Sequence, residues 1–420
     1  MNLPWRPSPL RTFPMNTKAL LLATTLAFSA AASAEGPWTG TWRASPQPLW
    51  SGNFVLPTMA PFQFVQQTLR QPMRVSLGGD RWRVVVSNTY GTQPLRIGAA
   101  AFARSAGGVA IDPDASRRLT FGGQPGVEIP AGGEAVSDPV ALAVPALGRV
   151  AVSLHLPGPV APATFHWDAR ETGYTADGDQ VAAPTFAAAT PMPVRAFVSR
   201  LLVEGGAGSV VVLGDSLTDG NGSTPGTDRR WPDVLAERLA PRGVAVQNAG
   251  ISGARLLRDG MGDSASARVD REVFAWPGVR SVIVALGTND IGWPGGPFAP
   301  GEAAMTVERL AAGYRQLAER ARVHGVRVIG TTVPPFEGAL QGTPLEGHHS
   351  VAKDRVRQAV NHWIRTSGTF DAVVDFDAVL RDPAHPARLR PAFDSGDHLH
   401  PGDTGYRAMA GAIDLDTLAK

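Results

Sequence analysis

Ser216 is the residue around which the sequence suggests chemistry. It follows the apolar run 210–213 and a glycine at position 214, and mostly polar or small residues continue as far as 230. A short aliphatic run that ends at a glycine is typical of a buried parallel strand. Open α/β sheets bind their ligands at the carboxyl ends of such strands, so we predict that Ser216 is a nucleophile at this edge of the sheet.

Three further motifs follow predicted strands and should therefore share the same edge. They are Asn-Ala-Gly-Ile-Ser-Gly at 248–253, Gly-Thr-Asn-Asp at 287–290 and Asp-His-Leu-His at 397–400. Core packing does not require serine, glycine, asparagine and an Asp/His pair to converge. Acyl transfer does require them.

These motifs supply the groups that a serine hydrolase needs. A serine hydroxyl becomes a strong nucleophile when a histidine accepts its proton and a carboxylate fixes the tautomer of that histidine. We predict Ser216, His400 and Asp397 for these three roles. The tetrahedral intermediate also needs hydrogen-bond donors aimed at its oxyanion. We predict that this oxyanion hole is formed by the backbone N–H groups of Ser216 and Gly250 and the side-chain amide of Asn289.

Together these motifs resemble the four sequence blocks of the SGNH (GDSL-type) hydrolases. The blocks correspond to Gly-Asp-Ser-Leu at 214–217, Gly250, Asn289 and the Asp397-x-x-His400 pair, and the resemblance spans position 208 to the C-terminus. It implies a flavodoxin-like parallel sheet of strand order 2-1-3-4-5, a Ser–His–Asp triad, a three-donor oxyanion hole, and hydrolysis of esters, thioesters or acetylated sugars. An exported chain with a β domain before this domain is similar to the secreted XynE-like acylesterase branch, which implies acetyl groups on plant polysaccharide.

Phosphate chemistry fits the sequence less well. Residues 214–220 lack the Gly-Lys-Ser/Thr of a phosphate-binding loop, and no Gly-x-Ser-x-Gly elbow surrounds Ser216. An aspartate-nucleophile phosphatase would place two aspartates two positions apart, whereas Asp215 and Asp219 are separated by four. We expect both aspartates to fix the turn around the serine.

Structural roles remain open for several of these residues. Ser216 could cap a helix, and Asn289 could be a turn residue. His398 lies between Asp397 and His400 in sequence, but this cluster offers fewer ligands than a transition-metal site usually has. We therefore predict no metal and no cofactor, with His398 as a bystander.

The first 34 residues have the pattern of a signal peptide. Lys18 precedes an apolar run at 19–31, and Ala-Ser-Ala at 32–34 is a small-residue cleavage site. We predict a start at Met1 or Met15, cleavage after Ala34, and export to the periplasm or the medium. No later stretch is long enough to span a bilayer, so no integral membrane association is predicted. The chain has no cysteine, which excludes disulfides and thiolate metal sites.

The rest of the chain divides into two predicted domains. Residues 35–200 alternate apolar and polar positions, which predicts a β-sandwich or jelly-roll-like domain. A linker is expected within 180–193, and 194–203 is either a last β strand or the connection. Residues 201–420 alternate strands with helices and predict a parallel sheet covered by helices on both sides. Its five strands are expected at 210–213, 244–246, 281–285, 326–331 and 372–375.

The charge of the mature chain gives no reason to expect a nucleic-acid partner. Cleavage of the signal peptide removes three basic residues and leaves 36 basic and 37 acidic ones, so the mature chain is nearly neutral. The oligomeric state stays open.

Loops at the reactive edge should bind the substrate, and those expected there are 255–261, 292–298 and 333–336. Trp293 and Phe298 are predicted to be exposed aromatics that stack on a sugar ring or cover an acyl chain. We expect an exported serine esterase that hydrolyses acetyl or other short acyl esters on carbohydrate. A lipase or lysophospholipase is the alternative enzyme. A carbohydrate-binding protein with an inactive hydrolase domain is the alternative of another class.

Overall fold

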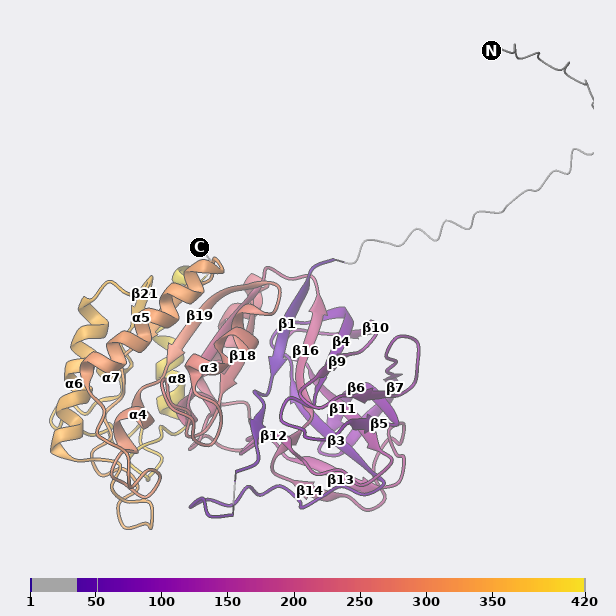
Figure 1. Ribbon diagram of the computed structural model, residues 1–420, viewed down its shortest axis with the longest axis horizontal. Helices are drawn as coiled ribbons and strands as arrows, with labels where there is room; N and C mark the ends of the chain where they lie inside the picture. Colours follow the sequence, from indigo (N-terminus) through magenta and orange to yellow (C-terminus); the bar gives the residue numbers. More distant parts are fainter. Residues whose placement is uncertain (2–35, 51, 419–420) are drawn as a thin grey trace, which may run out of the picture. The chain divides into compact units, whose positions relative to one another are not determined.

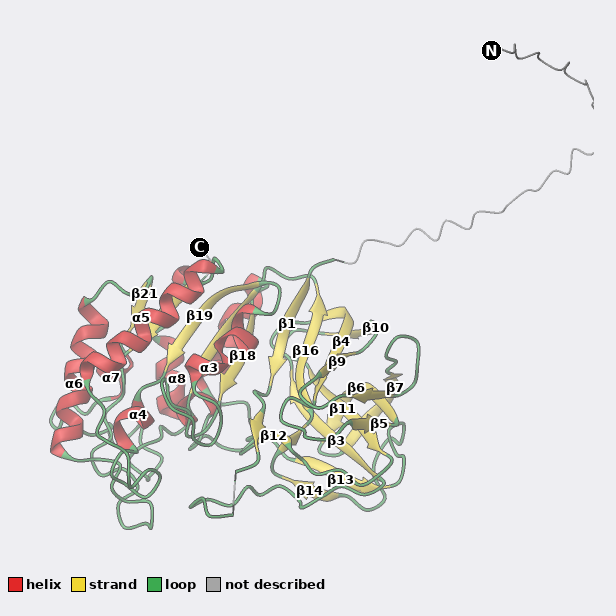
Figure 2. Cartoon of the chain, viewed as in Figure 1, coloured by secondary structure: helices red, strands yellow, loops and turns green. Residues whose placement is uncertain are grey.

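The computed structural model describes residues 36–50 and 52–418, together with Met1 (Figure 1). Met1 apart, the predicted signal peptide at 1–34 lies outside the described residues, as does the alternative start at Met15. From residue 36 onward the chain forms an all-β half followed by an α/β half, which the strand and helix colours of Figure 2 distinguish. Within these described ranges, no helix combines the length and apolarity needed to cross a membrane.

Two antiparallel sheets make up most of the β half. The first runs in the order β1 (Trp38–Arg43), β16 (Val198–Glu204), β4 (Gly79–Ser87) and β10 (Val140–Val144), and β9 (Glu134–Val136) also pairs with β4. The second runs in the order β14 (Thr190–Met192), β13 (Gly173–Asp177), β3 (Gln67–Arg74), β11 (Arg149–Leu156), β6 (Ala99–Gly107) and β7 (Ala110–Arg118). Two smaller sheets consist of β2 (Gln47–Pro48), β12 (Thr164–His166) and β15 (Arg195–Ala196), and of β5 (Leu95–Ile97) with β8 (Val127–Ile129).

Side chains from the two large sheets share one hydrophobic core. Trp82, Val84 and Val86 alternate along β4 and are fully buried in it. Phe102 of β6, in the other sheet, packs against Trp82 with ring centroids 5.4 Å apart. Because successive side chains of a strand point to opposite faces, this alternation places one face of β4 in the core. The prediction of an all-β part before the α/β part is confirmed.

The connection between the halves differs from the expected linker. The segment 180–193 packs into the β half, since Val181 and Phe186 are buried and β14 pairs with β13. Its proline-rich composition is compatible with a strand because β14 lies at the edge of its sheet. The chain then continues into β16, between β1 and β4, and only residues 205–208 separate β16 from the α/β half.

A parallel sheet forms the centre of the α/β half. Its order is β18 (Ala245–Gly250), β17 (Ser209–Gly214), β19 (Val279–Ala285), β20 (Arg327–Thr331) and β21 (Ala372–Val374). Numbered along the chain, this is the order 2-1-3-4-5 that the resemblance implies. All five predicted strands are present.

Helices cover both faces of this sheet. Val211 and Leu213 of β17 belong to one core, with α3 (Ala265–Val269), α5 (Val307–Val323) and α6 (Val351–Thr366). Val210 and Val212 belong to the opposite core, with α2 (Trp231–Leu239), α7 (Phe376–Leu380) and α8 (Asp403–Gly411). Two short helices, α1 (Ser216–Asp219) and α4 (Thr288–Gly292), begin just after β17 and β19 and so lie at the carboxyl edge of the sheet.

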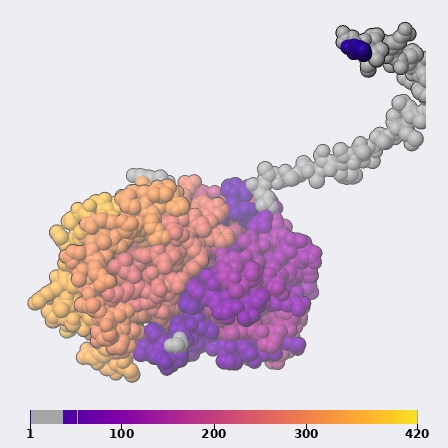
Figure 3. All heavy atoms as spheres, viewed as in Figure 1, coloured from indigo at the N-terminus to yellow at the C-terminus, as the bar shows by residue number. Residues whose placement is uncertain are grey.

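Buried polar contacts join the two halves, whose surfaces meet along a continuous boundary in Figure 3. Arg43 of β1 forms a fully buried salt bridge with Glu272, and Ser45 Oγ donates to the same carboxylate at 2.8 Å. Burial alone would raise the pKa of Glu272, but Arg43 and other nearby arginines hold it at about 2. Gln47 Nε2 donates to the backbone oxygen of Met261 at 2.8 Å. The β half therefore provides the charge partner of a buried glutamate of the α/β half, as well as hydrogen bonds to that half.

Candidate active site

Ser216 lies two residues beyond β17 and is the first residue of α1. Asp215 caps this helix, since its Oδ1 accepts a hydrogen bond from the backbone N–H of Leu217 at 3.0 Å. Burial raises the pKa of Asp215 to about 7. The helix ends after a single turn at Gly220, whose φ of 108° favours glycine. This strand–turn–helix arrangement holds the serine at the carboxyl edge, and Asp215 has the structural role that was expected.

His400 and Asp397 lie next to Ser216, although the histidine is 184 residues further along the chain. His400 Nε2 is 2.8 Å from Ser216 Oγ, and His400 Nδ1 is 2.6 Å from Asp397 Oδ2. Asp397 Oδ1 accepts the backbone N–H groups of His400 at 2.8 Å and Leu399 at 2.9 Å. Burial would raise the pKa of Asp397, but these hydrogen bonds and the nearby imidazole lower it below its usual value. Hydroxyl, imidazole and carboxylate are thus aligned for proton transfer.

Gly250 lies beside the nucleophile strand but has its own hydrogen-bond partner. It is the last residue of β18 and pairs in register with Gly214. Its backbone N–H donates to Asn248 Oδ1 at 2.9 Å, a contact that the sequence did not suggest. A Cβ at this position would lie 2.4 Å from the backbone nitrogen of Asp219, so only glycine fits. The close approach of β18 to α1 brings this segment to the serine.

Asn289 reaches the same site from α4. Its side chain is buried, and Nδ2 donates to the backbone oxygen of Ala254 at 3.0 Å. An amide nitrogen carries two hydrogens, so one N–H remains beyond this bond. The next residue, Asp290, accepts the backbone N–H groups of Leu256 and Leu257 at 2.7 and 3.1 Å, and burial raises its pKa to about 6. Two adjacent residues of α4 therefore bind the segment 254–257, which fixes the position of Asn289.

An apolar cavity of about 200 Å³ opens onto these groups. Ser216, Asn289 and His400 line it, together with the apolar side chains of Leu56, Trp167, Met261, Trp293, Phe298, Leu340, Leu345 and Leu399. Leu56 and Trp167 come from the β half.

The two predicted substrate aromatics both line the cavity, but neither is exposed as expected, since Trp293 is buried and Phe298 is half-buried. Trp293 is buried and stacks on Phe298 with ring centroids 4.7 Å apart and planes within 12°. Phe54 of the β half covers both rings from 6.1–6.2 Å, which explains why Trp293 is hidden from solvent. The loop 333–336 was also expected at the substrate, but Val333 and Phe336 are buried in the core beneath the sheet edge.

Comparison with known proteins identifies the family of this region. Residues 212–408 match the sequence model of the GDSL-like Lipase/Acylhydrolase family. This part of the chain is similar to the GDSL-like acylhydrolases. It is a carboxylic ester hydrolase, as the sequence predicts.

The GDSL-like part is also similar to solved structures. A GDSL-like lipase from Bacteroides thetaiotaomicron is 20% identical, with 50% of this chain and 88% of that chain covered and a TM-score of 0.38. A carbohydrate acetylesterase family member from Sinorhizobium meliloti is 18% identical, with 50% and 96% covered and a TM-score of 0.38. The aryl esterase of M. smegmatis is 18% identical, with 50% and 99% covered and a TM-score of 0.38. Among curated proteins, none matches the chain significantly.

His398 of the GDSL-like part contacts a carboxylate other than Asp397. Its Nδ1 is 2.5 Å from Asp394 Oδ2, and its side chain is half exposed. Among residues 36–50 and 52–418, no cluster of three or more His, Cys, Asp or Glu side chains could hold a metal ion.

Other residues around the GDSL-like site could not be found from the sequence. His348 is buried against the cavity, and burial lowers its pKa to about 3. Leu56, Trp167 and His166 belong to the β half, and they reach the site only through the contact between the halves. No spacing or motif in the sequence signals such contacts.

Proposed function

We propose that Ser216, His400 and Asp397 are the catalytic triad of an exported esterase that removes acetyl or other short acyl groups from carbohydrate. The observation that carries this proposal is the pair of short contacts around His400. One of its ring nitrogens is 2.8 Å from the Ser216 hydroxyl, and the other is 2.6 Å from the Asp397 carboxylate. This is the arrangement in which a histidine acts as base and then as acid.

The reaction proceeds in two halves through an acyl-enzyme. Ser216 Oγ attacks the ester carbonyl carbon while His400 Nε2 accepts the hydroxyl proton. The tetrahedral intermediate then expels the alcohol, which takes that proton from His400. In the second half, a water molecule gives a proton to His400 and attacks the acyl carbon, which releases the acid and regenerates Ser216. Asp397 stays ionised and stabilises the imidazolium in both halves.

Three donors are proposed to stabilise the oxyanion. They are the remaining N–H of Asn289, the backbone N–H of Ser216 and that of Gly250. The N–H of Gly250 donates to Asn248 Oδ1 in the described structure, so it must share or leave this bond when the oxyanion forms. Asn289 is the donor best supported by its position in the cavity wall.

The substrate class is supported by two surfaces of different character. The apolar cavity beside Ser216 suits the acyl group. The loop that carries Leu340 and Leu345 also contributes to a second groove, whose polar lining residues are Glu337, Gln341, Glu346, His349, Arg388 and His398. Carboxylate, amide, imidazole and guanidinium groups suit the hydroxyls of a sugar better than an aliphatic chain. We therefore propose a carbohydrate as the alcohol part of the ester.

Export and domain limits are part of the same proposal. We propose that cleavage after Ala34 releases a mature chain with a β-sandwich domain that begins at residue 35 and ends with β16, and a flavodoxin-like catalytic domain that begins with β17, so that the boundary lies at 205–208 and not at 200. Peptide mapping of the protein from the periplasm or medium should give an N-terminus at Glu35. An N-terminus at Met1 or Met15 in the exported protein would contradict cleavage.

Replacement of the nucleophile tests the activity directly. Ser216→Ala should abolish release of p-nitrophenol from p-nitrophenyl acetate and of acetate from acetylated xylan, with an unchanged circular dichroism spectrum. Serine-directed phosphonates should label the wild type at Ser216. An unlabelled wild-type protein that binds acetylated xylan would instead support the inactive, carbohydrate-binding alternative. Turnover by Ser216→Ala equal to that of the wild type would refute the triad.

A lipase or lysophospholipase is the second candidate, because most of the cavity wall is apolar. A series of p-nitrophenyl esters from two to twelve acyl carbons separates the two functions. We expect kcat/KM to be highest for acetyl or propionyl esters. A maximum at eight or more carbons, together with hydrolysis of lysophospholipid, would replace the carbohydrate esterase by the lipase.

A further inference from the structure

Asp219 connects the helix of the nucleophile to the segment that follows Gly250. It is the last residue of α1, which begins at Ser216. Its Oδ2 accepts the backbone N–H of Ser252 at 3.1 Å and the Ser252 hydroxyl at 2.8 Å. Ser252 also lines the cavity beside the serine. One carboxylate oxygen thus fixes the distance between α1 and the segment that carries Gly250, a proposed oxyanion donor.

The other oxygen of Asp219 meets a histidine of the β half. His166, the last residue of β12, is buried, and its Nε2 is 2.9 Å from Asp219 Oδ1. Its Nδ1 is 3.0 Å from the backbone oxygen of Ser45, also in the β half. The imidazole therefore bridges the two halves of the molecule at a point one helical turn from Ser216.

The acceptors on both sides define the protonation of His166. A carbonyl oxygen only accepts hydrogen bonds, so Nδ1 must donate to Ser45. Asp219 also acts as an acceptor, since its other oxygen accepts two hydrogen bonds from Ser252. Nε2 must then donate as well, and a ring that donates from both nitrogens is an imidazolium.

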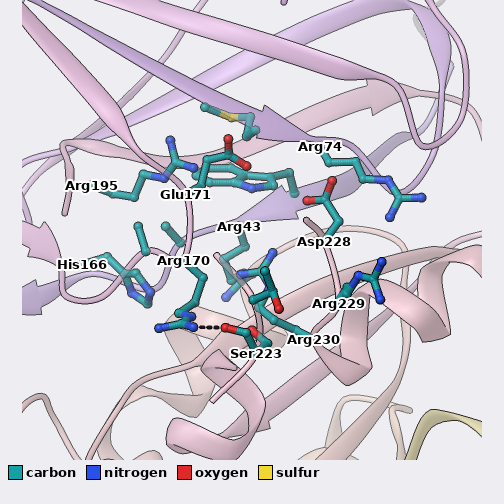
Figure 4. Close-up of a pocket in the computed structure, with 15 residues that line it drawn as sticks. Arg43, Arg74, His166, Arg170, Glu171, Arg195, Ser223, Asp228, Arg229 and Arg230 are labelled. Carbon is teal, nitrogen blue, oxygen red and sulfur yellow. Dashed lines mark hydrogen bonds between the residues drawn. The ribbon is translucent and has the colours of Figure 1, made fainter. Parts of the chain in front are cut away.

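The charged groups around His166 are of both signs. In Figure 4 it lies beside Arg170, and Arg43 and Arg195 line the same small cavity. The acidic groups near His166 are Asp219 and Asp168. Burial raises the pKa of Asp168, and the charge of His166 opposes this rise. Burial and Arg195 lower the pKa of His166, but Asp219 outweighs both and raises it above the usual value.

We propose that His166 is a positioning residue of the esterase site: as an imidazolium it holds Asp219, and through Asp219 it holds the Ser252 segment beside the nucleophile. This inference rests on the proposed role of Ser216. It gives the β half a part in catalysis, because the charge that aligns the site comes from β12. Loss of this charge leaves a neutral hydrogen bond, which is weaker.

The proposal predicts an effect of pH with a definite sign. The pKa of His166 in the folded chain lies above the value of about 6.5 of an unfolded chain. The stabilisation that the charged His166 ring provides is therefore complete below about pH 6.5, and it is lost as the pH rises through the higher folded-state pKa. Above that pKa, the lone pair of Nδ1 faces the carbonyl oxygen of Ser45, and the bridge weakens.

Variants of the mature full-length protein test the role. His166→Gln keeps one donor toward Asp219 without the charge, and should lower kcat about tenfold, the equivalent of 1.36 kcal/mol, with KM within about twofold. Asp219→Asn should give a similar loss, and the double variant should lose little more than either single one. His155→Gln, a half-buried histidine of β11, is the matched control and should retain the kcat of the wild type.

Two readouts keep the proposal separate from the proposed function and from simple unfolding. In protein labelled with ¹⁵N-histidine, the ring of His166, assigned by comparison with His166→Gln, should show both nitrogens protonated at pH 6. The alkaline decline of kcat that belongs to this ring should be absent in His166→Gln. A neutral ring at pH 6, or a His166→Gln variant with the kcat and pH profile of the wild type, would overturn the proposal. An active Ser216→Ala variant would instead remove the proposed function on which it rests.

Discussion

Asn289→Ala removes a proposed catalytic hydrogen bond and a structural one, and the two losses affect different quantities. In the folded protein Asn289 Nδ2 donates to the backbone oxygen of Ala254 at 3.0 Å, and only one N–H is left for the oxyanion. Loss of an oxyanion donor lowers kcat by about 10²–10³, which corresponds to roughly 2.7–4 kcal/mol. Because this bond strengthens only in the transition state, KM should stay within about twofold.

The same substitution also affects stability, but too little to explain the loss in rate. The free energy of unfolding should fall by about 1–3 kcal/mol, because the carbonyl of Ala254 loses its donor. Even a protein with a free energy of unfolding of about 5 kcal/mol would remain more than about 95% folded. The folded fraction therefore accounts for only a few per cent of activity.

Asn88→Ala is the matched control for this experiment. Asn88 is also 3% exposed, like Asn289, and its Nδ2 donates to three backbone oxygens at 2.9–3.1 Å, all within the β half. Its removal should lower the free energy of unfolding at least as much, with kcat within about threefold of the wild type. We would measure kcat and KM with p-nitrophenyl acetate at 25 °C, and stability by urea unfolding. If Asn289→Ala kept its kcat, or if both variants lost activity alike, the oxyanion role would be wrong.

Two further substitutions test the carboxylates. Asp397→Asn should lower kcat by about 10⁴ through the wrong histidine tautomer. Because the folded-state pKa of Asp397 is lowered, its charge stabilises the fold above about pH 4, and urea unfolding of wild type and variant should converge as the pH falls through the folded-state pKa. A stability difference independent of pH would contradict this. Glu272→Gln leaves the buried Arg43 without its charge partner and should lower the free energy of unfolding by about 3–5 kcal/mol, whereas an unchanged urea midpoint would show that the halves do not depend on the pair.

The α/β half could be predicted because its signals are local. Aliphatic runs that end at glycine mark the parallel strands, and the polar residues that follow them fall at one edge by geometry alone. For this reason Ser216, Asn289 and His400 could be expected together before any contact was known. The alternation of Trp82 with Val84 in the β half is a signal of the same kind.

The remaining features depend on contacts between distant segments. Trp293 looked exposed because its loop is rich in glycine and proline, but Phe54 from the other half covers it. The segment 180–193 looked like a linker because its composition resembles one, whereas an edge strand tolerates the same residues. The bond from Gly250 to Asn248 depends on how one side chain turns, which composition and periodicity do not specify.

The wall of the cavity has two origins. Leu56 and Trp167 fold with the β half, whereas Ser216 and Asn289 are held by the parallel sheet. Sequence drift at the first pair can reshape the space beside the scissile bond while the reactive groups keep their places. The preference for one acyl group over another can thus diverge in descendants of this chain faster than the reaction itself. Saturation mutagenesis of Leu56 and Trp167 is therefore a direct way to alter this preference.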